Sequence, residues 1–176
     1  MVVGYLTCDL DKSHNDSIPM PNAFDRHEPN LPPGARDMLA TIRMHGWSYA
    51  PDDHHAYTTG LGFSLKAPEI VVCAQASHVA RDLLAEACRQ LEAGVKLRAG
   101  KPYDGFFDDC PVYFQPVEKR WYDRYFGWSV WFWGGYDFKA LQMVVPDSAG
   151  LLPWQPGFDP AEMQPDLSGG KWAARG

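Results

Sequence analysis

The stretch LQMVVPD, residues 141–147, predicts a buried strand that ends in a polar turn. Its first five residues are apolar except for Gln142, and Pro146 and Asp147 then end the run. A continuous apolar run of this length suits a strand that is covered on both faces of a sheet. If Gln142 faces inward, its side-chain amide must find hydrogen-bond partners there. We therefore expect the last strand of a sheet at residues 141–145.

Four earlier segments also have the composition of strands. The first two are joined by residues 51–55, a Pro and Asp-rich link of the length that closes a hairpin, so these two strands should be antiparallel. The third contains the apolar run IVVCA and is expected at the centre of the sheet. Prolines in the fourth predict a short or edge strand. The four segments are residues 47–49, 56–63, 69–75 and 111–117.

Helical spacing of apolar residues predicts two or three helices. Residues 35–44 form a short amphipathic helix that stops at Gly46, and residues 77–93 form a longer helix with Ser77 as its N-cap and Gly94 after its end. The aromatic residues of 121–133 also recur at helical spacing, although their propensity suits a strand as well. We expect an α+β fold, with a mostly antiparallel sheet of about five strands packed with two or three helices.

The distribution of proline and polar residues divides the chain into three parts. Residues 1–34 are rich in Pro, Asn, Asp and Ser and are expected to be an extended N-terminal arm. Residues 35–167 are expected to form a single α+β domain, in which residues 95–109 are a polar connection. Residues 168–176 are expected to be a flexible tail.

Composition excludes several classes of function. The chain has 176 residues, 45% of them hydrophobic, and a formal charge of −6, which disfavours nucleic-acid binding because that needs a basic face. Its four cysteines show no CxxC pairing, which favours a reducing cytoplasm. No apolar run approaches the roughly 20 residues that a membrane span needs. We expect a cytoplasmic protein with no nucleic-acid or membrane partner.

Several short motifs resemble a bacterial family known as domain of unknown function 4262. They are Gly46-Trp47, the sequence YTTGL at 57–61, Pro68-Glu69-Ile70, and residues 142–147 followed by Gly150 and Pro153-Trp154. Together they span roughly residues 38–166. The resemblance implies a soluble, single-domain protein of bacterial or phage type. It implies no reaction, cofactor or catalytic residue.

Polar and glycine positions interrupt the apolar strands, and this pattern suggests a site for a small polar ligand. Glu69 starts a buried strand, so its carboxylate needs a partner or a shifted pKa. Gly60 lets a ligand or another backbone approach closely. The plainer interpretations are that Thr and Tyr are good strand residues and that Asp147 caps a turn. The candidate ligand-binding residues are Tyr57, Thr58, Gly60, Glu69, Gln142 and Asp147, and we expect Glu69, Gln142 and Asp147 to converge at one end of the sheet.

The sequence shows no established catalytic motif. Residues 52–55, Asp-Asp-His-His, carry metal-ligand chemistry, but a solvated hairpin loop is the favoured interpretation and no metal site is predicted. A GxSxG elbow, a P-loop and a GxGxxG motif are all absent from the chain. The cofactor therefore stays unknown, and the sequence leaves open whether the protein is an enzyme.

The aromatic residues between 121 and 138 are too dense to lie on one buried stripe of a helix. Exposed Trp128 and Trp131 are candidate interface residues, because Trp commonly anchors protein interfaces. Alternatively, the N-terminal arm covers this segment. The leading hypothesis is binding of a small polar ligand. The alternative is a protein-interaction module of the antitoxin, immunity or phage–host conflict kind, which binds a protein partner or forms a homodimer through an acidic and aromatic surface.

Overall fold

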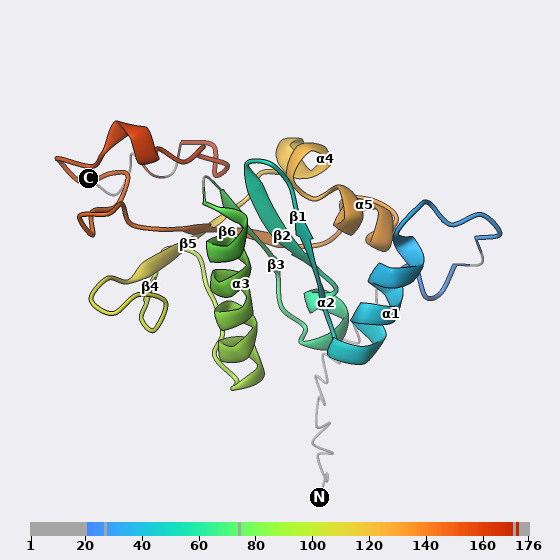
Figure 1. Ribbon diagram of the computed structural model, residues 1–176. Helices are drawn as coiled ribbons and strands as arrows, with labels where there is room; N and C mark the ends of the chain where they lie inside the picture. The colour runs from blue at the N-terminus through green and yellow to red at the C-terminus, as the bar shows by residue number, and fades with distance from the viewer. Residues whose placement is uncertain (1–20, 27, 74, 171, 173–176) are drawn as a thin grey trace, which may run out of the picture.

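The computed structural model describes residues 21–26, 28–73, 75–170 and 172. They form a mixed six-stranded sheet with the strand order β1-β2-β3-β6-β5-β4 (Figure 1). The strands are β1 (Ser48–Pro51), β2 (His55–Thr59), β3 (Glu69–Cys73), β4 (Pro102–Tyr103), β5 (Val112–Pro116) and β6 (Ala140–Val144). The helices are α1 (Ala35–His45), α2 (Leu61–Ser64), α3 (Ser77–Glu92), α4 (Tyr122–Tyr125) and α5 (Gly127–Trp133), with 3-10 turns at Lys119–Trp121 and Pro160–Glu162. The α+β class is confirmed.

The two central strands of the sheet run parallel. Four of the five neighbouring strand pairs are antiparallel, including the β1–β2 hairpin that the sequence predicts. The exception is β3 with β6, in which Glu69 lies beside Ala140 and Val72 beside Met143. Every residue of β3 and of β6 is buried, which explains their continuous apolar sequences.

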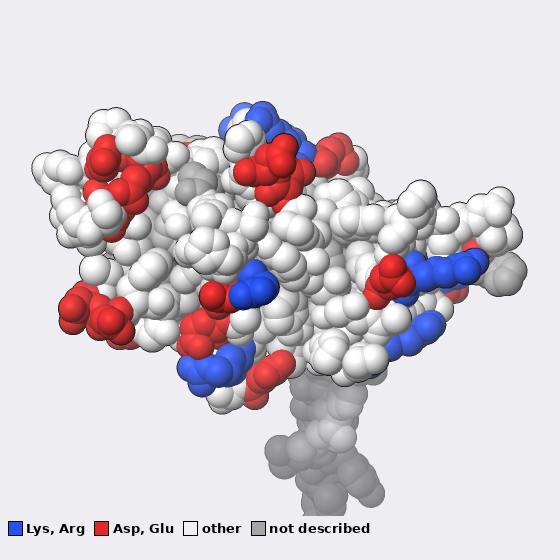
Figure 2. Space-filling view, in the orientation of Figure 1, with Lys and Arg blue, Asp and Glu red and all other residues white. Residues whose placement is uncertain are grey.

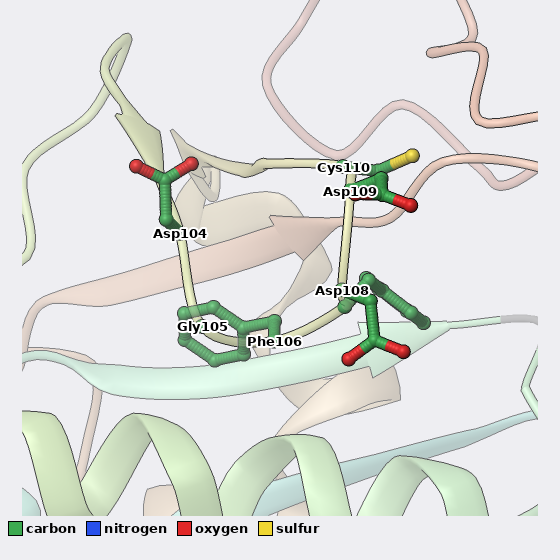
Figure 3. Close-up of a pocket in the computed structure, with 7 residues that line it drawn as sticks. Asp104, Gly105, Phe106, Asp108, Asp109 and Cys110 are labelled. Carbon is green, nitrogen blue, oxygen red and sulfur yellow. The ribbon is translucent and has the colours of Figure 1, made fainter.

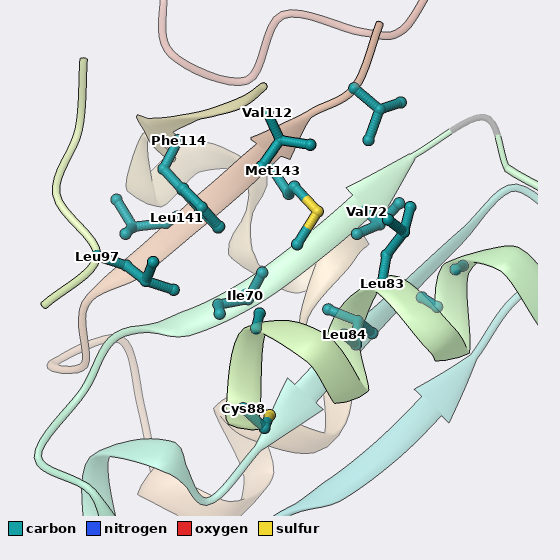
Figure 4. Packing of buried hydrophobic residues seen from close by; sticks show 14 of the residues in the cluster. Ile70, Val72, Leu83, Leu84, Cys88, Leu97, Val112, Phe114, Leu141 and Met143 are labelled. Carbon is teal, nitrogen blue, oxygen red and sulfur yellow. The ribbon is translucent and has the colours of Figure 1, made fainter. Parts of the chain in front are cut away.

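One face of the sheet is covered by α3 (Figure 1). Leu83, Leu84 and Cys88 of this helix pack against Ile70 and Met143 of the central strands (Figure 4). The helix predicted for residues 77–93 is confirmed, although Ala76 occupies the N-cap position in place of Ser77.

The opposite face carries α4 and α5. The helical interpretation of the aromatic segment is confirmed, but Phe126, with φ −141°, breaks it into two short helices. Tyr122 and Phe126 pack with Tyr57 of β2 and Val71 of β3 in a second apolar cluster. Because of the break, the two helices do not share one continuous buried face. Tyr122, Tyr125 and Phe126 belong to this second cluster, whereas Phe132 belongs to a third cluster.

The predicted second strand stops earlier than expected. It ends at Thr59, because Gly60 adopts φ +106°, and residues 61–64 form the short helix α2 instead of continuing to Phe63 as a strand. The expected connection at 95–109 contains the two-residue strand β4, which pairs with β5. The fourth predicted strand is therefore second from the edge.

Both ends of the described chain pack on this core. Ala23, Phe24 and Leu31, from the predicted arm, pack against the cluster that Phe132 forms with α1. At the other end, Trp172 is buried with Val144 and Leu152, and Ser168 is also buried. Residues 1–20, 27, 171 and 173–176 of the predicted arm and tail lie outside the described residues. Within the described part of the chain, no helix is long and apolar enough to cross a membrane.

Candidate functional site

The carboxylate of Glu69 accepts four hydrogen bonds in the interior of the protein. Glu69 is 1% exposed. Its Oε1 accepts from the backbone N of Gly60 at 2.9 Å and from Nε1 of Trp133 at 3.2 Å. Its Oε2 accepts from Thr58 Oγ1 at 2.9 Å and from the backbone N of Leu61 at 3.3 Å. Thr58, Gly60 and Glu69, three of the predicted site residues, therefore lie together.

Burial changes the acid–base behaviour of Glu69. Loss of hydration raises its pKa to about 7, and the donors from Gly60, Thr58, Trp133 and Leu61 oppose this rise. None of the ion pairs between described residues includes Glu69. Its carboxylate is thus held by neutral hydrogen-bond donors, and both of its oxygens are occupied by the chain itself.

Gly60 is fixed at its position by close neighbours. A Cβ added to it would lie 3.0 Å from Ile42 Cγ2 and 3.1 Å from the carbonyl oxygen of Gly46. Both neighbours belong to the end of α1, so the strand-to-helix turn at Gly60 sits directly on α1. The close approach expected at this glycine is confirmed, and the approaching groups are the Ile42 side chain and the Gly46 backbone of the chain itself.

Tyr57 also contributes to this internal network. Its hydroxyl accepts a hydrogen bond from the backbone N of Trp128 at 3.0 Å, at the start of α5. Ser129 reinforces the link, because its Oγ donates to the carbonyl oxygen of Thr58 at 3.0 Å and lies 2.8 Å from Thr59 Oγ1. Nothing in the sequence distinguishes Ser129 as a buried partner of β2. These bonds fix α5 to the sheet.

Gln142 lies on β6 beside Val71, and its hydrogen bonds go to the C-terminal segment and not to Glu69. Its Nε2 donates to the carbonyl oxygen of Pro165 at 2.7 Å, and its Oε1 accepts from the backbone N of Leu167 at 3.1 Å. The inward-facing amide thus finds the partners it needs, and these fasten the C-terminal segment over the sheet. Gln115, the neighbour of Gln142 on β5, is also buried, and its Nε2 has no partner among the described residues.

Asp147 caps the loop that follows β6. Its Oδ1 accepts from the backbone N of Ala149 at 3.0 Å and of Leu151 at 2.8 Å, and its Oδ2 accepts from that of Asp159 at 2.8 Å. Burial opposes ionisation of this carboxyl, but the three N–H donors outweigh it and hold its pKa below the ordinary value. The capping interpretation of Asp147 is confirmed.

The expected convergence of Glu69, Gln142 and Asp147 at one end of the sheet is wrong for Glu69 and Asp147. Glu69 lies beside Ala140 at the beginning of β6, whereas Asp147 follows the end of that strand. Because β3 and β6 are parallel, the beginning of one strand cannot meet the end of the other. Hydrogen bonds within the chain already occupy Glu69 and Asp147 at opposite ends of the central strands.

The residues that make up this network lie in a part of the chain that matches a family model. The family model described as "Domain of unknown function (DUF4262)" matches residues 41–159. The chain belongs to this family. The match confirms the resemblance read from the sequence motifs. No curated protein and no solved structure matches the chain.

Among the described residues of the DUF4262 region, the loop of residues 104–110 lines a cavity (Figure 3). Its volume is about 410 Å³, and all its lining residues come from this loop, including Asp104, Asp108 and Cys110. None of the predicted ligand-binding residues lines it. Among the described residues, no group of three or more His, Cys, Asp or Glu side chains is placed to hold a metal ion.

His55 is a packed side chain in this DUF4262 domain. It is 8% exposed, stacks on Tyr57 with ring centroids 5.8 Å apart, and meets the ring of Tyr125 at 4.9 Å. Burial lowers its pKa, and Asp52, whose Oδ1 lies 3.8 Å from Nδ1, opposes that change. His54 is exposed on the hairpin link. The two histidines therefore occupy different environments.

Trp128 and Trp131 are half-buried, with ring centroids 5.8 Å apart at 89°. Arg26 lies over the Trp131 ring, 5.5 Å from its centroid, and donates to the carbonyl oxygens of Trp131 and, at 3.4 Å, Phe132. A cation at the end of α5 satisfies carbonyl groups that the helix leaves free. Arg26 and its neighbours Ala23 and Phe24, from the predicted N-terminal arm, therefore cover part of this aromatic segment.

The largest apolar exposure near the Glu69 network lies outside the predicted site residues. Met44, at the end of α1, is 75% exposed, and Phe63, on α2, is 40% exposed. The ring of Phe24 lies 5.2 Å from that of Phe63, and the Arg43 guanidinium lies over Phe24 at 4.6 Å. We refer to Phe24, Arg43, Met44, Phe63 and Lys66 as the α1–α2 surface. All except Phe24 lie within the residues that the DUF4262 model matches.

Proposed function

We propose that this DUF4262 domain is a protein-interaction module and that its partner docks on the α1–α2 surface. The observation that carries the proposal is the exposure of Phe63, at 40%, beside Phe24, and of Met44, at 75%, next to Arg43 on α1. Large apolar side chains that gather on a surface commonly mark an interface. Aromatic residues, Met and Arg, which make up most of this surface, are the types enriched at interface centres.

The network beneath the surface supports the same function. Glu69 binds the backbone N of Gly60 and of Leu61, at the start of the helix that carries Phe63. Gly46, which ends α1, lies so close to Ser64 that an added Cβ would be 3.0 Å from Ser64 Cβ. The two helices are therefore fixed against each other before a partner arrives. A preorganised surface loses less conformational entropy on binding.

The structure gives less support to a small polar ligand at the predicted residues. The carboxylate of Glu69 already accepts four hydrogen bonds from the chain itself, and that of Asp147 accepts three. A ligand would have to replace these bonds in the interior. The polar residues are better explained as the framework that positions α2 and the loop after β6.

Site-specific photo-crosslinking tests the proposal. A benzophenone amino acid is placed at Met44 or Phe63 in the full chain, and the adducts formed in the producing cells are identified by mass spectrometry. Val95 serves as the matched control, because it is apolar and 37% exposed after the end of α3. We expect one partner to be captured from positions 44 and 63 but not from 95, and the purified partner to reproduce the adduct. Equal capture from position 95, or no capture from 44 and 63, would contradict the function.

A further inference from the structure

Two cations lie near the exposed residue Phe63. Lys66 donates from its Nζ to the carbonyl oxygen of Phe63 at 3.2 Å. The ring of Phe24 lies 5.2 Å from the Phe63 ring, and the guanidinium of Arg43 lies over Phe24 at 4.6 Å. The apolar residues of the α1–α2 surface therefore lie beside two positively charged side chains, Arg43 and Lys66. When a guanidinium stacks on an aromatic ring, its N–H groups still point outward in the guanidinium plane, where they can donate to a carboxylate.

These cations have no internal carboxylate partner. Neither Arg43 nor Lys66 is in an ion pair with any residue that the structure describes, whereas Arg81, Arg89 and Arg120 are each paired. Two acidic residues close to Phe24 in the sequence are engaged elsewhere. Glu28 is paired with Arg26 at 3.2 Å, and Asp25 accepts a hydrogen bond from the backbone N of Asn22. The positive charge of the surface is thus available to a partner.

The charge around this surface also differs from that of the whole chain. The formal net charge is −6. In the view of Figure 2, acidic groups gather at the end of the molecule that carries the C-terminal segment and β4, while basic groups lie together with acidic ones at the end that carries α1. A positive region on an acidic protein attracts an acidic partner and repels a basic one, which gives specificity as well as a faster encounter.

Building on the function proposed above, we infer that the partner contributes a segment in which a large apolar side chain lies between acidic residues. The apolar side chain packs on Phe63 and Met44. The acidic residues beside it bind Arg43 and Lys66. A basic or uncharged segment of equal hydrophobicity lacks the second contact and binds more weakly.

Selection from a displayed library of random 12-residue segments tests this inference, with the purified full-length protein as bait. We expect the selected segments to carry Phe, Leu or Trp flanked by Asp or Glu, and to bind more weakly at high salt because the charges are exposed to solvent. The best segment is then synthesised and titrated against variants by fluorescence anisotropy. A version with its acidic residues replaced by Lys is titrated in parallel.

Two pairs of variants separate the apolar and the charged contributions. Phe63→Ser tests the apolar contact, with Val95→Ser as the matched exposed apolar control. Arg43→Glu and Lys66→Glu test the charged contacts, with Lys101→Glu, an exposed lysine on another part of the chain, as the matched charge control. We expect at least a tenfold loss of affinity in each test variant and less than a twofold change in the controls, with unchanged circular dichroism spectra.

The outcomes distinguish the partner chemistry from the function itself. Segments that bind at Phe63 but show no acidic preference, or that tolerate Arg43→Glu and Lys66→Glu, would overturn the inference and leave the interaction module intact. Selection of no segment, or of segments whose binding is unaffected by Phe63→Ser, would overturn both. Acidic segments that need Phe63, Arg43 and Lys66 support both.

Discussion

Glu69 and Trp133 are 64 positions apart in the chain, and the indole Nε1 of Trp133 donates to Oε1 of Glu69 at 3.2 Å. The same carboxylate accepts from the backbone N of Gly60 and Leu61 at the start of α2. One buried side chain thus connects β3 to both α2 and α5. The position of Phe63, and with it the α1–α2 surface, depends on this connection.

Replacing Glu69 with Gln should change how stability depends on pH. Because burial raises the pKa of Glu69 from 4.5 to about 7, the folded protein holds a proton in this interval that the unfolded chain releases. The contribution of Glu69 to the free energy of unfolding is therefore full below pH 4.5 and falls as the pH rises through about 7, by at most about 1.4 kcal/mol per pH unit. Urea denaturation between about pH 5 and about pH 8 measures it. Parallel pH profiles for Glu69→Gln and the wild type would refute this assignment.

Replacing Gly60 with Ala should destabilise the protein more than the same change at Gly94. Both glycines have positive φ, +106° and +90°, so both substitutions strain the backbone. Only at Gly60 does the new Cβ meet Ile42 Cγ2 at 3.0 Å and the Gly46 carbonyl at 3.1 Å, because nothing lies within 4 Å at Gly94. We expect about 1 kcal/mol of strain at Gly94 and roughly 3 kcal/mol at Gly60. Equal losses in chemical denaturation would show that the turn at Gly60 does not rest on α1.

Asp147→Asn should lower the melting temperature at neutral pH. The amide cannot accept all three backbone N–H bonds from Ala149, Leu151 and Asp159. The pKa of Asp147 is held below its ordinary value of 3.8, so its stabilisation is present above that pH and is lost as the pH falls through the folded-state pKa. The wild type and the variant should therefore converge in acid. Asp108→Asn, on an exposed loop, is the control and should leave melting unchanged at both pH values.

Arg26→Gln should loosen the N-terminal segment from α5. The guanidinium binds the carbonyl oxygens of Trp131 and Phe132 and lies over the Trp131 ring. We expect faster amide hydrogen exchange at residues 22–26 and altered tryptophan emission, with exchange in α3 unchanged. Arg98→Gln, at an exposed arginine, provides the comparison. Unchanged exchange at residues 22–26 would mean that the packing of Phe24, and not Arg26, holds the segment.

Local sequence patterns predicted the elements that local physics controls. The apolar run at residues 70–73 became the central strand β3, and the stripe of residues 77–93 became α3. Glu69 was identified because a carboxylate at the start of a buried strand needs partners. Thr58 and Gly60, which prove to be its partners, were identified for a hydroxyl on a strand and for the close approach that a glycine allows.

The sequence could not predict contacts that depend on how distant elements assemble. Nothing local places Trp133 over Glu69, or makes β3 and β6 parallel, which is what separates Glu69 from Asp147. The sequence TTGLGF suits a strand, and α2 forms there because Gly60 turns the chain onto α1. Met44 did leave a signal, because it lies off the apolar stripe of Met38, Leu39 and Ile42.

Amide hydrogen exchange of the protein with and without the best library-selected segment tests the central claim most directly. The interaction module predicts protection at residues 22–26, 41–46 and 61–66, which together form the α1–α2 surface and its supports. It also predicts that Phe63→Ser abolishes this protection while Val95→Ser preserves it. Protection confined to the loop of residues 104–110, or to α3, would contradict the account.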